Sequence, residues 1–220
     1  PMDATLQLVS ADGFVLDPAA WDPAFLAFDY IGAWWHDQHG ARAVGNGGFS
    51  LRSRRLLRAL QNPALTSSHP EDRCICHQHR ERLETENGIR FAPPELAARF
   101  AYERVAPLGP TFGFHGLFNL HRVLDAQALH ELVERLPDAM VRRLDAHDLC
   151  HTLIGLRRLD TAALILAKRR RLGMLDRRTW RLTAQLWWAR RRTRTEVSTT
   201  RAAAVVGVPV VADGAGGPPR

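Results

Sequence analysis

Lysine is almost missing from this sequence, and cysteine is scarce. Lys168 is the single lysine among 30 basic residues. Together with the many alanines, this indicates a GC-rich coding sequence, so part of the arginine content reflects codon usage rather than phosphate binding. The three cysteines, Cys74, Cys76 and Cys150, are too few for a disulfide framework.

The sequence also lacks segments of the kind that enter or cross a membrane. A membrane-spanning helix needs about 20 consecutive apolar residues. The longest candidate, residues 202–212, is short and contains Gly207 and Pro209. The N-terminus has neither the basic region nor the apolar region of a secretory signal. We therefore expect a cytoplasmic protein without a transmembrane segment.

The chain does contain enough apolar material to build a core. Hydrophobic residues make up 45% of its 220 residues, which excludes a globally disordered protein. The length suits one domain with an appendage, or two small domains.

Charge is distributed unevenly around a net value of +7. Residues 1–140 contain 13 arginines against 17 acidic residues, whereas residues 141–201 contain 16 basic residues against five acidic ones. Like charges at this density are costly unless solvent or an anionic partner offsets them. The basic segment is therefore a candidate for contact with an anionic surface, which would make the protein peripheral to a membrane.

The residue pattern changes near Asp125. Before it, strand-like runs such as residues 6–16 and 28–35 alternate with helical stretches such as residues 52–60 and 71–84, which favours an α/β fold. After it, apolar residues recur at helical spacing, as expected for a run of short antiparallel helices.

Three of these helical stretches, residues 145–156, 160–172 and 176–189, begin with an aspartate suited to an N-cap. Gly155 and Gly173 stand where two of the helices are expected to end.

This organisation predicts three parts. Residues 1–124 form an α/β domain and residues 125–193 a basic helical region. Residues 194–220 are rich in small residues, glycine and proline, and we expect them to be a disordered tail.

Two candidate binding features lie in the first 50 residues. Asp12 follows an apolar strand, where a carboxylate can hold a divalent cation or a sugar hydroxyl, although an ordinary turn aspartate is the commoner interpretation. The segment Gly45-Asn46-Gly47-Gly48 lets the backbone approach a ligand closely, and the Asn46 amide can donate to or accept from hydroxyls. An Asn-Gly pair is also an ordinary turn signal.

Two further candidates carry titratable groups. Glu71 and Asp72 follow Pro70 at the start of a helix, where the helix dipole favours carboxylates, and either can act as a general base. His115 lies between Gly113 and Gly116 in a turn-prone loop, from which its imidazole could project into a cleft to bind metal or phosphate.

A cluster of soft ligands, Cys74, Cys76, His77 and His79, suggests zinc at first sight. Structural zinc sites usually take ligand pairs from two separate places, and one face of a helix here supplies only two of the four residues. We therefore interpret the cysteines as buried thiols beside exposed imidazoles.

Taken in order, these segments resemble an uncharacterised bacterial domain family grouped with the GT-A glycosyltransferases. The resemblance covers about residues 6–120 and rests on the segments DGFVL (12–16), FDYIGAWW (28–35), GNGGFSLR (45–52), ED (71–72) and GFHG (113–116). The hallmark segments of that family read D-Y-I-G-A-P-W and G-N-G-G-F-S-L-R. Both have counterparts here, with Trp34 where proline is usual.

The resemblance implies a partial GT-A-like mixed sheet followed by an α-helical region. Its implied activity is that of a hexosyltransferase, which moves a sugar from a nucleotide-sugar donor to a hydroxyl of a glycan, lipid or protein acceptor. Asp12 and His115 would hold a divalent metal, manganese or magnesium, and Glu71 or Asp72 would be the base. The sugar or acceptor pocket would be lined by Gly45, Asn46, Gly47 and Gly48, with Trp34.

In the resembled family the domain continues upstream by several strands and helices that form the nucleotide-binding half. The resemblance therefore indicates an N-terminally truncated chain, with or without activity of its own.

A second hypothesis is a non-catalytic interaction protein. Its basic helices would bind acidic partners, an anionic membrane surface or nucleic acid, with Trp180, Trp187 and Trp188 beside several arginines supplying the contacts. In the plainer interpretation these tryptophans are helix core and the arginines form a solvated face.

Overall fold

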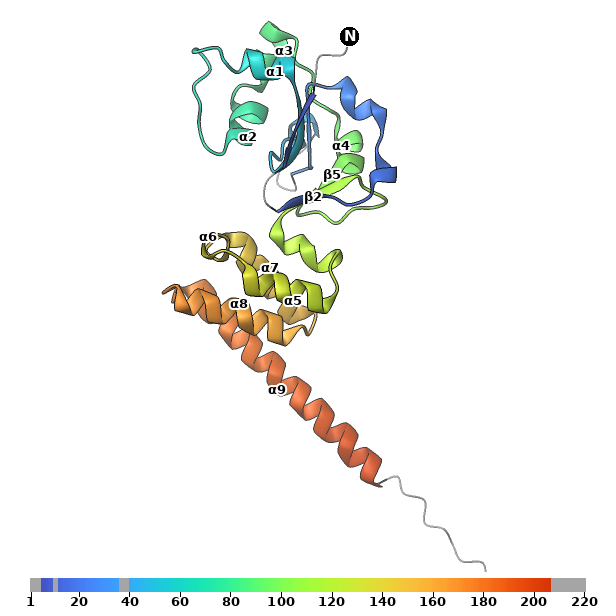
Figure 1. Cartoon of the computed structure of the whole chain (residues 1–220), viewed down its shortest axis with the longest axis vertical. Coiled ribbons are helices and arrows are strands. Elements are labelled where there is room, and N and C mark those ends of the chain that lie inside the picture. The colour runs from blue at the N-terminus through green and yellow to red at the C-terminus, as the bar shows by residue number, and fades with distance from the viewer. Residues whose placement is uncertain (1–4, 10–11, 36–39, 207–220) are drawn as a thin grey trace, which may run out of the picture.

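The computed structural model describes residues 5–9, 12–35 and 40–206. Figure 1 shows a mixed α/β body, a helical region next to it, and one long helix that extends away from both. The fold is thus mixed α/β with small sheets and a helical C-terminal region, as the sequence predicts at this level. Every helix in the described residues is too short or too polar to cross a bilayer.

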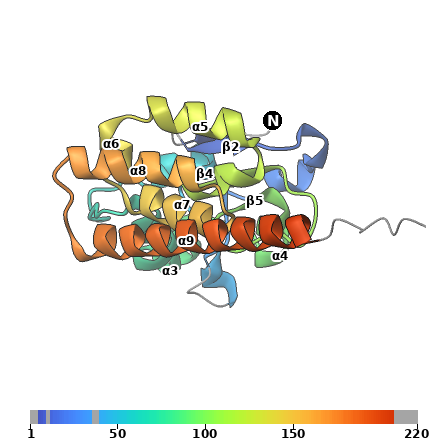
Figure 2. The same cartoon turned by 90° about the horizontal axis from the view of Figure 1, so that it is seen from below.

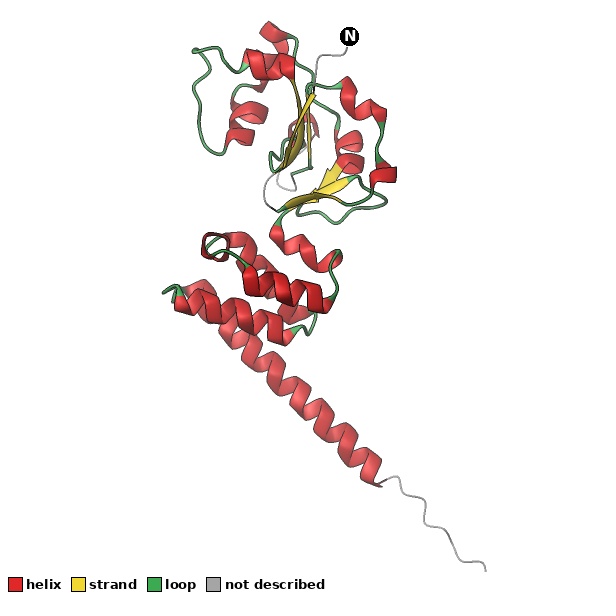
Figure 3. Ribbon diagram, viewed as in Figure 1, coloured by secondary structure: helices red, strands yellow, loops and turns green. Residues whose placement is uncertain are grey.

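Six strands run through the described residues and form two three-stranded sheets (Figure 3). They are β1 (Thr5–Val9), β2 (Gly13–Val15), β3 (Tyr30–Gly32), β4 (Phe49–Ser53), β5 (Ala101–Tyr102) and β6 (Gly113–His115). In the first sheet β4 pairs antiparallel with both β1 and β3. In the second sheet β6 is antiparallel to β2 and parallel to β5, so this sheet is mixed.

Strand β4 is buried at every position. Its polar residues Ser50, Arg52 and Ser53 must therefore find hydrogen-bond partners inside the protein, because an unpaired buried polar group is costly. Ser53 also caps the helix that follows, accepting a hydrogen bond from the Leu56 amide at 3.1 Å.

Strand β6 replaces the loop that the two glycines at 113 and 116 predict. Gly113 belongs to the strand, and a Cβ at this position would lie 2.4 Å from the Phe49 ring of the other sheet. The glycine therefore allows the two sheets to pack closely, and His115 occupies the last strand position, opposite Gly13 of β2. The sequence suggested that His115 lies on an open loop, and this prediction was wrong because the residue is part of β6.

Short helical segments connect the strands. They are η1 (Pro18–Ala20), η2 (Pro23–Ala27), η3 (Gly40–Ala43), α1 (Arg54–Ala59), α2 (Glu71–Arg73), the π-helical η4 (Cys74–Gln78), α3 (Arg80–Asn87) and α4 (Pro94–Phe100). Asp17 caps η1 by accepting a hydrogen bond from the Ala19 amide at 2.9 Å. The helix predicted over residues 71–84 is present, with a π-helical segment in its middle.

The helical region begins at η5 (Leu117–Arg122). It continues through α5 (Ala126–Arg135), α6 (Asp138–Val141), α7 (Leu144–Gly155), α8 (Leu159–Arg171) and α9 (Arg177–Val206). Asp125 and Asp176 cap α5 and α9, each accepting a backbone hydrogen bond at 2.8 Å. Asp145 and Asp160 instead lie inside the first turns of α7 and α8, where the helix dipole still favours them, so these two predicted caps were wrong.

The ends of α7 and α8 differ from each other. Gly173 follows α8 with φ of 72°, the left-handed geometry expected of a glycine after a helix. After α7 the left-handed residue is Arg157, with φ of 60°, because Gly155 is still part of the helix.

One hydrophobic core joins the second sheet to the helices. Tyr102 of β5 and Phe114 of β6 belong to the same buried cluster as Leu149 and Leu153 of α7 and Leu186 of α9. The change of sequence character near residue 124 therefore falls inside a continuous core. A domain boundary at that point stays a prediction.

Helix α9 continues well past the point where the sequence predicts disorder. Its backbone is helical through Val206, and residues 194–206 contain neither glycine nor proline, the two residues least compatible with a helix interior. Gly207 is the first residue of the predicted tail that breaks a helix. The rest of that tail, residues 207–220, lies outside the described residues.

Candidate functional site

The segment Gly45-Asn46-Gly47-Gly48 forms a tight turn that leads into β4. The turn lies against β3, and a Cβ at Gly32 would come within 2.1 Å of the Asn46 carbonyl oxygen. Asn46 is buried, and its side-chain oxygen accepts a hydrogen bond from the Gly48 amide at 3.1 Å. Asn46 therefore uses its acceptor to shape the turn, which leaves its amide nitrogen as the group available to a ligand.

A first charged group, formed by the side chains of Arg52, Glu71 and Asp72, contacts this turn at Gly47. The Gly47 amide donates to Asp72 Oδ2 at 3.1 Å, and Arg52 Nη2 donates to Glu71 Oε1 at 2.6 Å. A Cβ at Gly47 would lie 2.7 Å from Glu71 Oε1 and 2.9 Å from Arg52 Nη2. The glycine thus lets the start of α2 and the end of β4 approach the turn.

Only one partner of the Arg52–Glu71 ion pair is buried. Arg52 is buried, whereas the side chain of Glu71 is 57% exposed. Burial works to raise the pKa of the Glu71 carboxyl, but the hydrogen bond and the positive charge of Arg52 outweigh it and lower the pKa below its ordinary value. Glu71 is therefore a carboxylate at neutral pH with one oxygen bound and a face open to solvent.

A second charged group, formed by the side chains of Asp12, Glu103 and His115, contacts the turn at Gly48. His115 Nε2 lies 3.4 Å from Asp12 Oδ1, and His115 Nδ1 lies 3.3 Å from Glu103 Oε1. Burial works to lower the pKa of His115, but the carboxylates of Asp12 and Glu103 beside the ring raise it to about 9. At neutral pH the ring is an imidazolium between two carboxylates.

Gly48 allows this imidazolium to reach the turn. A Cβ at Gly48 would lie 2.1 Å from His115 Nε2, so the ring packs directly on the glycine backbone. The turn therefore joins two charged groups that are distant in the sequence, through two consecutive glycines.

A further carboxylate approaches the second group from the helical region. Burial raises the pKa of Asp145 in α7, and the negative charge of Asp12 raises it further. Arg104 bridges Asp145 at 3.5 Å and Asp148 at 2.7 Å. The helices thus contribute charge to a cluster that begins in the α/β body.

Asp12 and His115 come together as predicted, but their arrangement does not fit a resident cation. Each ring nitrogen of His115 faces a carboxylate, and the ring lies on Gly48, so neither nitrogen presents an open lone pair. Within the described residues, no group of three or more histidine, cysteine, aspartate or glutamate side chains is arranged to hold a metal ion. A manganese or magnesium cofactor stays a prediction.

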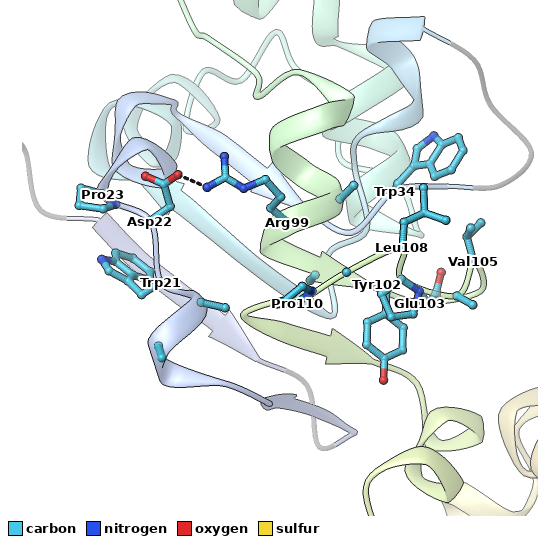
Figure 4. Close-up of a pocket in the computed structure, with 17 residues that line it drawn as sticks. Trp21, Asp22, Pro23, Trp34, Arg99, Tyr102, Glu103, Val105, Leu108 and Pro110 are labelled. Atoms are coloured by element: carbon cyan, nitrogen blue, oxygen red, sulfur yellow. Dashed lines mark hydrogen bonds and ion pairs between the residues drawn. The ribbon is translucent and has the colours of Figure 1, made fainter.

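Trp34 lies apart from the turn and lines a cavity of about 610 Å³. Figure 4 shows Trp21 and Asp22 on one side of this cavity, Trp34 and Leu108 on the other, and Arg99 reaching between them toward Asp22. The indole Nε1 of Trp34 is buried and has no hydrogen-bond partner among the described residues. Such a donor is costly unless a ligand accepts from it.

The cavity and the charged turn are neighbours through shared residues. Glu103 lines the cavity and also faces His115. Trp34 pairs with Val44, which directly precedes the Gly45 turn. An apolar, tryptophan-lined cavity with a few polar groups is typical of small-molecule binding.

The two cysteines of the cysteine and histidine cluster are buried, as predicted, whereas the imidazoles of His77 and His79 are half-buried and not exposed. Cys74 and Cys76 are buried, and their sulfur atoms face the carbonyl oxygens of Thr66 and Gly45. His79 Nε2 lies 2.9 Å from the Thr66 carbonyl oxygen.

Arg52, Glu103 and Asp145 belong to the site but were missed by sequence reasoning. The signal for Arg52 was its place in the segment that leads from the glycine turn into β4, since a charged side chain in a buried strand needs a partner. Glu103 and Asp145 gave none, because their roles depend on how β5 and α7 pack.

Comparison with known proteins places most of this site within one family. Residues 4–115 match the family model described as Protein of unknown function (DUF5672), and the matched segment ends at His115. The matched segment contains all nine residues that the sequence predicted for the sugar-transfer site, namely Asp12, Trp34, Gly45, Asn46, Gly47, Gly48, Glu71, Asp72 and His115. No curated protein and no solved structure matches the chain significantly.

Proposed function

The chain belongs to this family of unknown function, DUF5672, and from that premise we propose that it forms the acceptor-side part of a GT-A-like glycosyltransferase. The proposed reaction moves a hexosyl group from a nucleotide-sugar donor to a hydroxyl group of a glycan, lipid or protein.

One observation carries the proposal. A single glycine turn holds an open carboxylate, Glu71, on one side and a charged imidazole cluster on the other, beside a tryptophan-lined cavity. Sugar transfer needs a base for the acceptor hydroxyl and a place for the acceptor to bind, and this arrangement offers both.

Of the two adjacent carboxylates, Glu71 suits the base better. Both oxygens of Asp72 accept backbone hydrogen bonds, from Gly47 at 3.1 Å and from Arg73 at 2.8 Å, so Asp72 positions the turn. Glu71 is more exposed and stays ionised at neutral pH because Arg52 holds its pKa down. A lowered pKa makes Glu71 a weak base, so its contribution depends on placement next to the hydroxyl.

The cavity suits the acceptor. The indole rings of Trp21 and Trp34 offer apolar faces to a sugar ring or a lipid chain, and Trp34 Nε1 can donate to a hydroxyl or a carbonyl. Arg99 and Asp22, joined at 2.5 Å, add polar groups at the wall.

The role of the second charged group is electrostatic in this proposal. The imidazolium of His115 offsets part of the charge of Asp12 and Glu103 beside the turn.

Turnover of nucleotide sugars tests the proposal. The purified chain is incubated with UDP-, GDP- and dTDP-hexoses, with and without manganese, and release of nucleoside diphosphate is measured. We expect Glu71→Gln to lower the rate by about 10²- to 10⁴-fold, the usual contribution of a general base.

Glu84→Gln is the matched control, because Glu84 also pairs with a buried arginine, Arg80, at 2.9 Å but lies in α3. If both variants turn over nucleotide sugar at the same rate, or if the chain shows neither turnover nor binding of a sugar acceptor, the proposal is wrong.

A further inference from the structure

Helix α9 exposes three tryptophans on one side. The exposed fractions of Trp180, Trp187 and Trp188 are 61%, 47% and 59%. The helix is anchored by Leu182 and Leu186, which are buried in the shared core. The plainer sequence interpretation, in which these tryptophans are core residues, is therefore wrong.

Helical spacing makes these tryptophans part of one continuous stripe. Residues 180, 184, 187, 188 and 191 each lie three or four positions from another member of the set, so they share one face of the helix. All five are exposed, and Leu182 and Leu186 point to the other side. Contiguous apolar surface of this kind is rare on a protein that has no partner for it. We call it the Trp–Arg face, defined by Trp180, Ala184, Trp187, Trp188 and Arg191.

Arginines flank this face. Arg181 and Arg192 are exposed beside it, and residues 177–206 contain eight arginines against Glu196 as the single acidic residue. The guanidinium carbon of Arg191 lies 3.8 Å from the centre of the Trp187 ring. The face is therefore both aromatic and strongly positive.

The described parts of the protein leave this face uncovered. The first half of α9 packs on α7 and α8, and the rest extends beyond the helical region (Figure 1). Seen from below, α9 lies in front of the other helices (Figure 2). The Trp–Arg face lies opposite Leu182 and Leu186, which pack into the core, so this face points away from α7 and α8.

We propose that the Trp–Arg face docks the protein on a membrane surface that contains anionic lipids. Tryptophan is enriched at the boundary between headgroups and acyl chains, where its ring is buried and its N–H stays hydrated. Arginine pairs with lipid phosphates at the same depth. Because no helix in the described residues can span a bilayer, α9 would lie in the plane of the surface.

The ring geometry favours lipid over nucleic acid. Proteins that bind single strands offer open aromatic faces on which bases stack. Here the Trp187 ring is covered on one face by Arg191, and Trp188 packs against it edge to face, with ring centres 4.9 Å apart and an angle of 83°. Bulky side chains on a convex helix are better suited to entering a soft interface than to holding a strand.

Vesicle co-sedimentation tests the proposal. The full chain is mixed with vesicles of phosphatidylcholine alone or of phosphatidylcholine with phosphatidylglycerol. We expect binding to the anionic vesicles, weakened by salt, and quenching of tryptophan fluorescence by brominated acyl chains. The combined variant Trp180→Ala, Trp187→Ala and Trp188→Ala should lose both the binding and the quenching.

Two charge-reversed variants separate a specific face from general basic charge. Arg181→Glu with Arg192→Glu should weaken binding by about 20-fold or more, since each arginine near an anionic surface is worth about 1 kcal/mol. Arg54→Glu with Arg58→Glu changes the net charge equally on exposed positions of α1, and should weaken binding by about threefold at most. Circular dichroism confirms that all variants are folded.

Several results would overturn the proposal. These are equal binding to both kinds of vesicle, no binding to either, or equal weakening by the two charge-reversed pairs. Tighter binding to a single-stranded RNA oligonucleotide that displaces the vesicles would assign the face to nucleic acid. A dimer in light scattering that the tryptophan variant converts to monomer would assign it to a second copy of the chain.

Discussion

Gly48 is a position where the absence of a side chain shapes the candidate site. Replacing it with alanine would place a methyl group 2.1 Å from His115 Nε2, a contact that requires the ring or the turn to move. Since His115 is held on both sides by carboxylates, we expect Gly48→Ala to lower the free energy of unfolding by about 2–4 kcal/mol. Urea denaturation of both proteins measures this difference.

Gly155→Ala is the control for that substitution. Gly155 is the last residue of α7, and a Cβ there meets nothing within 4 Å. Alanine in a helix is favoured over glycine, so this variant should be neutral or more stable by up to about 1 kcal/mol. Equal destabilisation by the two substitutions would contradict the close packing at Gly48.

His115 gives the site a pH dependence of defined sign. Its folded-state pKa of about 9 lies above the ordinary value of 6.5, so its charged form stabilises the fold. This contribution, on the order of 3 kcal/mol, is complete below pH 6.5 and is lost as the pH rises through about 9.

Two measurements check this pH dependence. Nuclear magnetic resonance of the histidine rings should show one ring that titrates near pH 9 and is missing from His115→Gln. The stability difference between the wild type and this variant should shrink from pH 6.5 to pH 9. A His115 titration at an ordinary value would show that Asp12 and Glu103 do not hold the ring.

Helix α8 depends on one buried arginine. Arg169 donates to Thr179 Oγ1 and to the Val141 carbonyl oxygen, both at 3.1 Å, and thereby ties α8 to the start of α9 and the end of α6. Removing it leaves these acceptors without a donor in the core. We expect Arg169→Ala to cost about 3 kcal/mol or more.

Arg171→Ala is the matched comparison on the same helix. Arg171 pairs with Asp138 at 2.9 Å, but its side chain is 66% exposed, and such surface pairs are worth at most about 1 kcal/mol. Thermal unfolding of the two variants should therefore separate clearly. Similar melting temperatures would mean that the Arg169 contacts are replaced by water without loss.

On the scale of the whole molecule, the shared core predicts that the two regions unfold together. Leu149 of α7 is fully buried in the cluster that includes Phe114 of β6. We therefore expect Leu149→Ala to cost about 2–5 kcal/mol and to speed hydrogen exchange in β6 as much as in the helices.

Leu83→Ala supplies the reverse comparison. Leu83 is equally buried but lies in a cluster confined to the α/β body. If unfolding is cooperative, this variant should also speed exchange of the most protected amides in α7 and α8. Two separate unfolding transitions would instead support independent domains divided near residue 124.

The packing of the whole molecule explains why sequence reasoning found most residues of the site but not the contacts between them. Asp12, Glu71, Asp72, His115 and the glycine turn were each identified by local chemistry, and the structure brings them around one turn. Trp34 was assigned to the same pocket but lines the neighbouring cavity, and its backbone pairs with Val44 directly before the turn.

The sequence by itself determined the features that depend on neighbours a few residues away. These include the cap at Asp176, the helical repeat of the C-terminal region, the glycine turn, and the excess of arginine in residues 141–201. Each follows from the geometry of one turn or one strand, which a short window of residues contains.

Only the tertiary structure decided which distant groups meet. It placed His115 in a strand between Asp12 and Glu103, gave Glu71 the partner Arg52, and turned the tryptophans of α9 outward. These outcomes depend on the pairing of strands and the packing of helices, which the hydrophobic periodicity of separate segments leaves undetermined. Burial and the charges of these distant partners then shift the pKa values of the site residues, an effect that the local sequence does not predict.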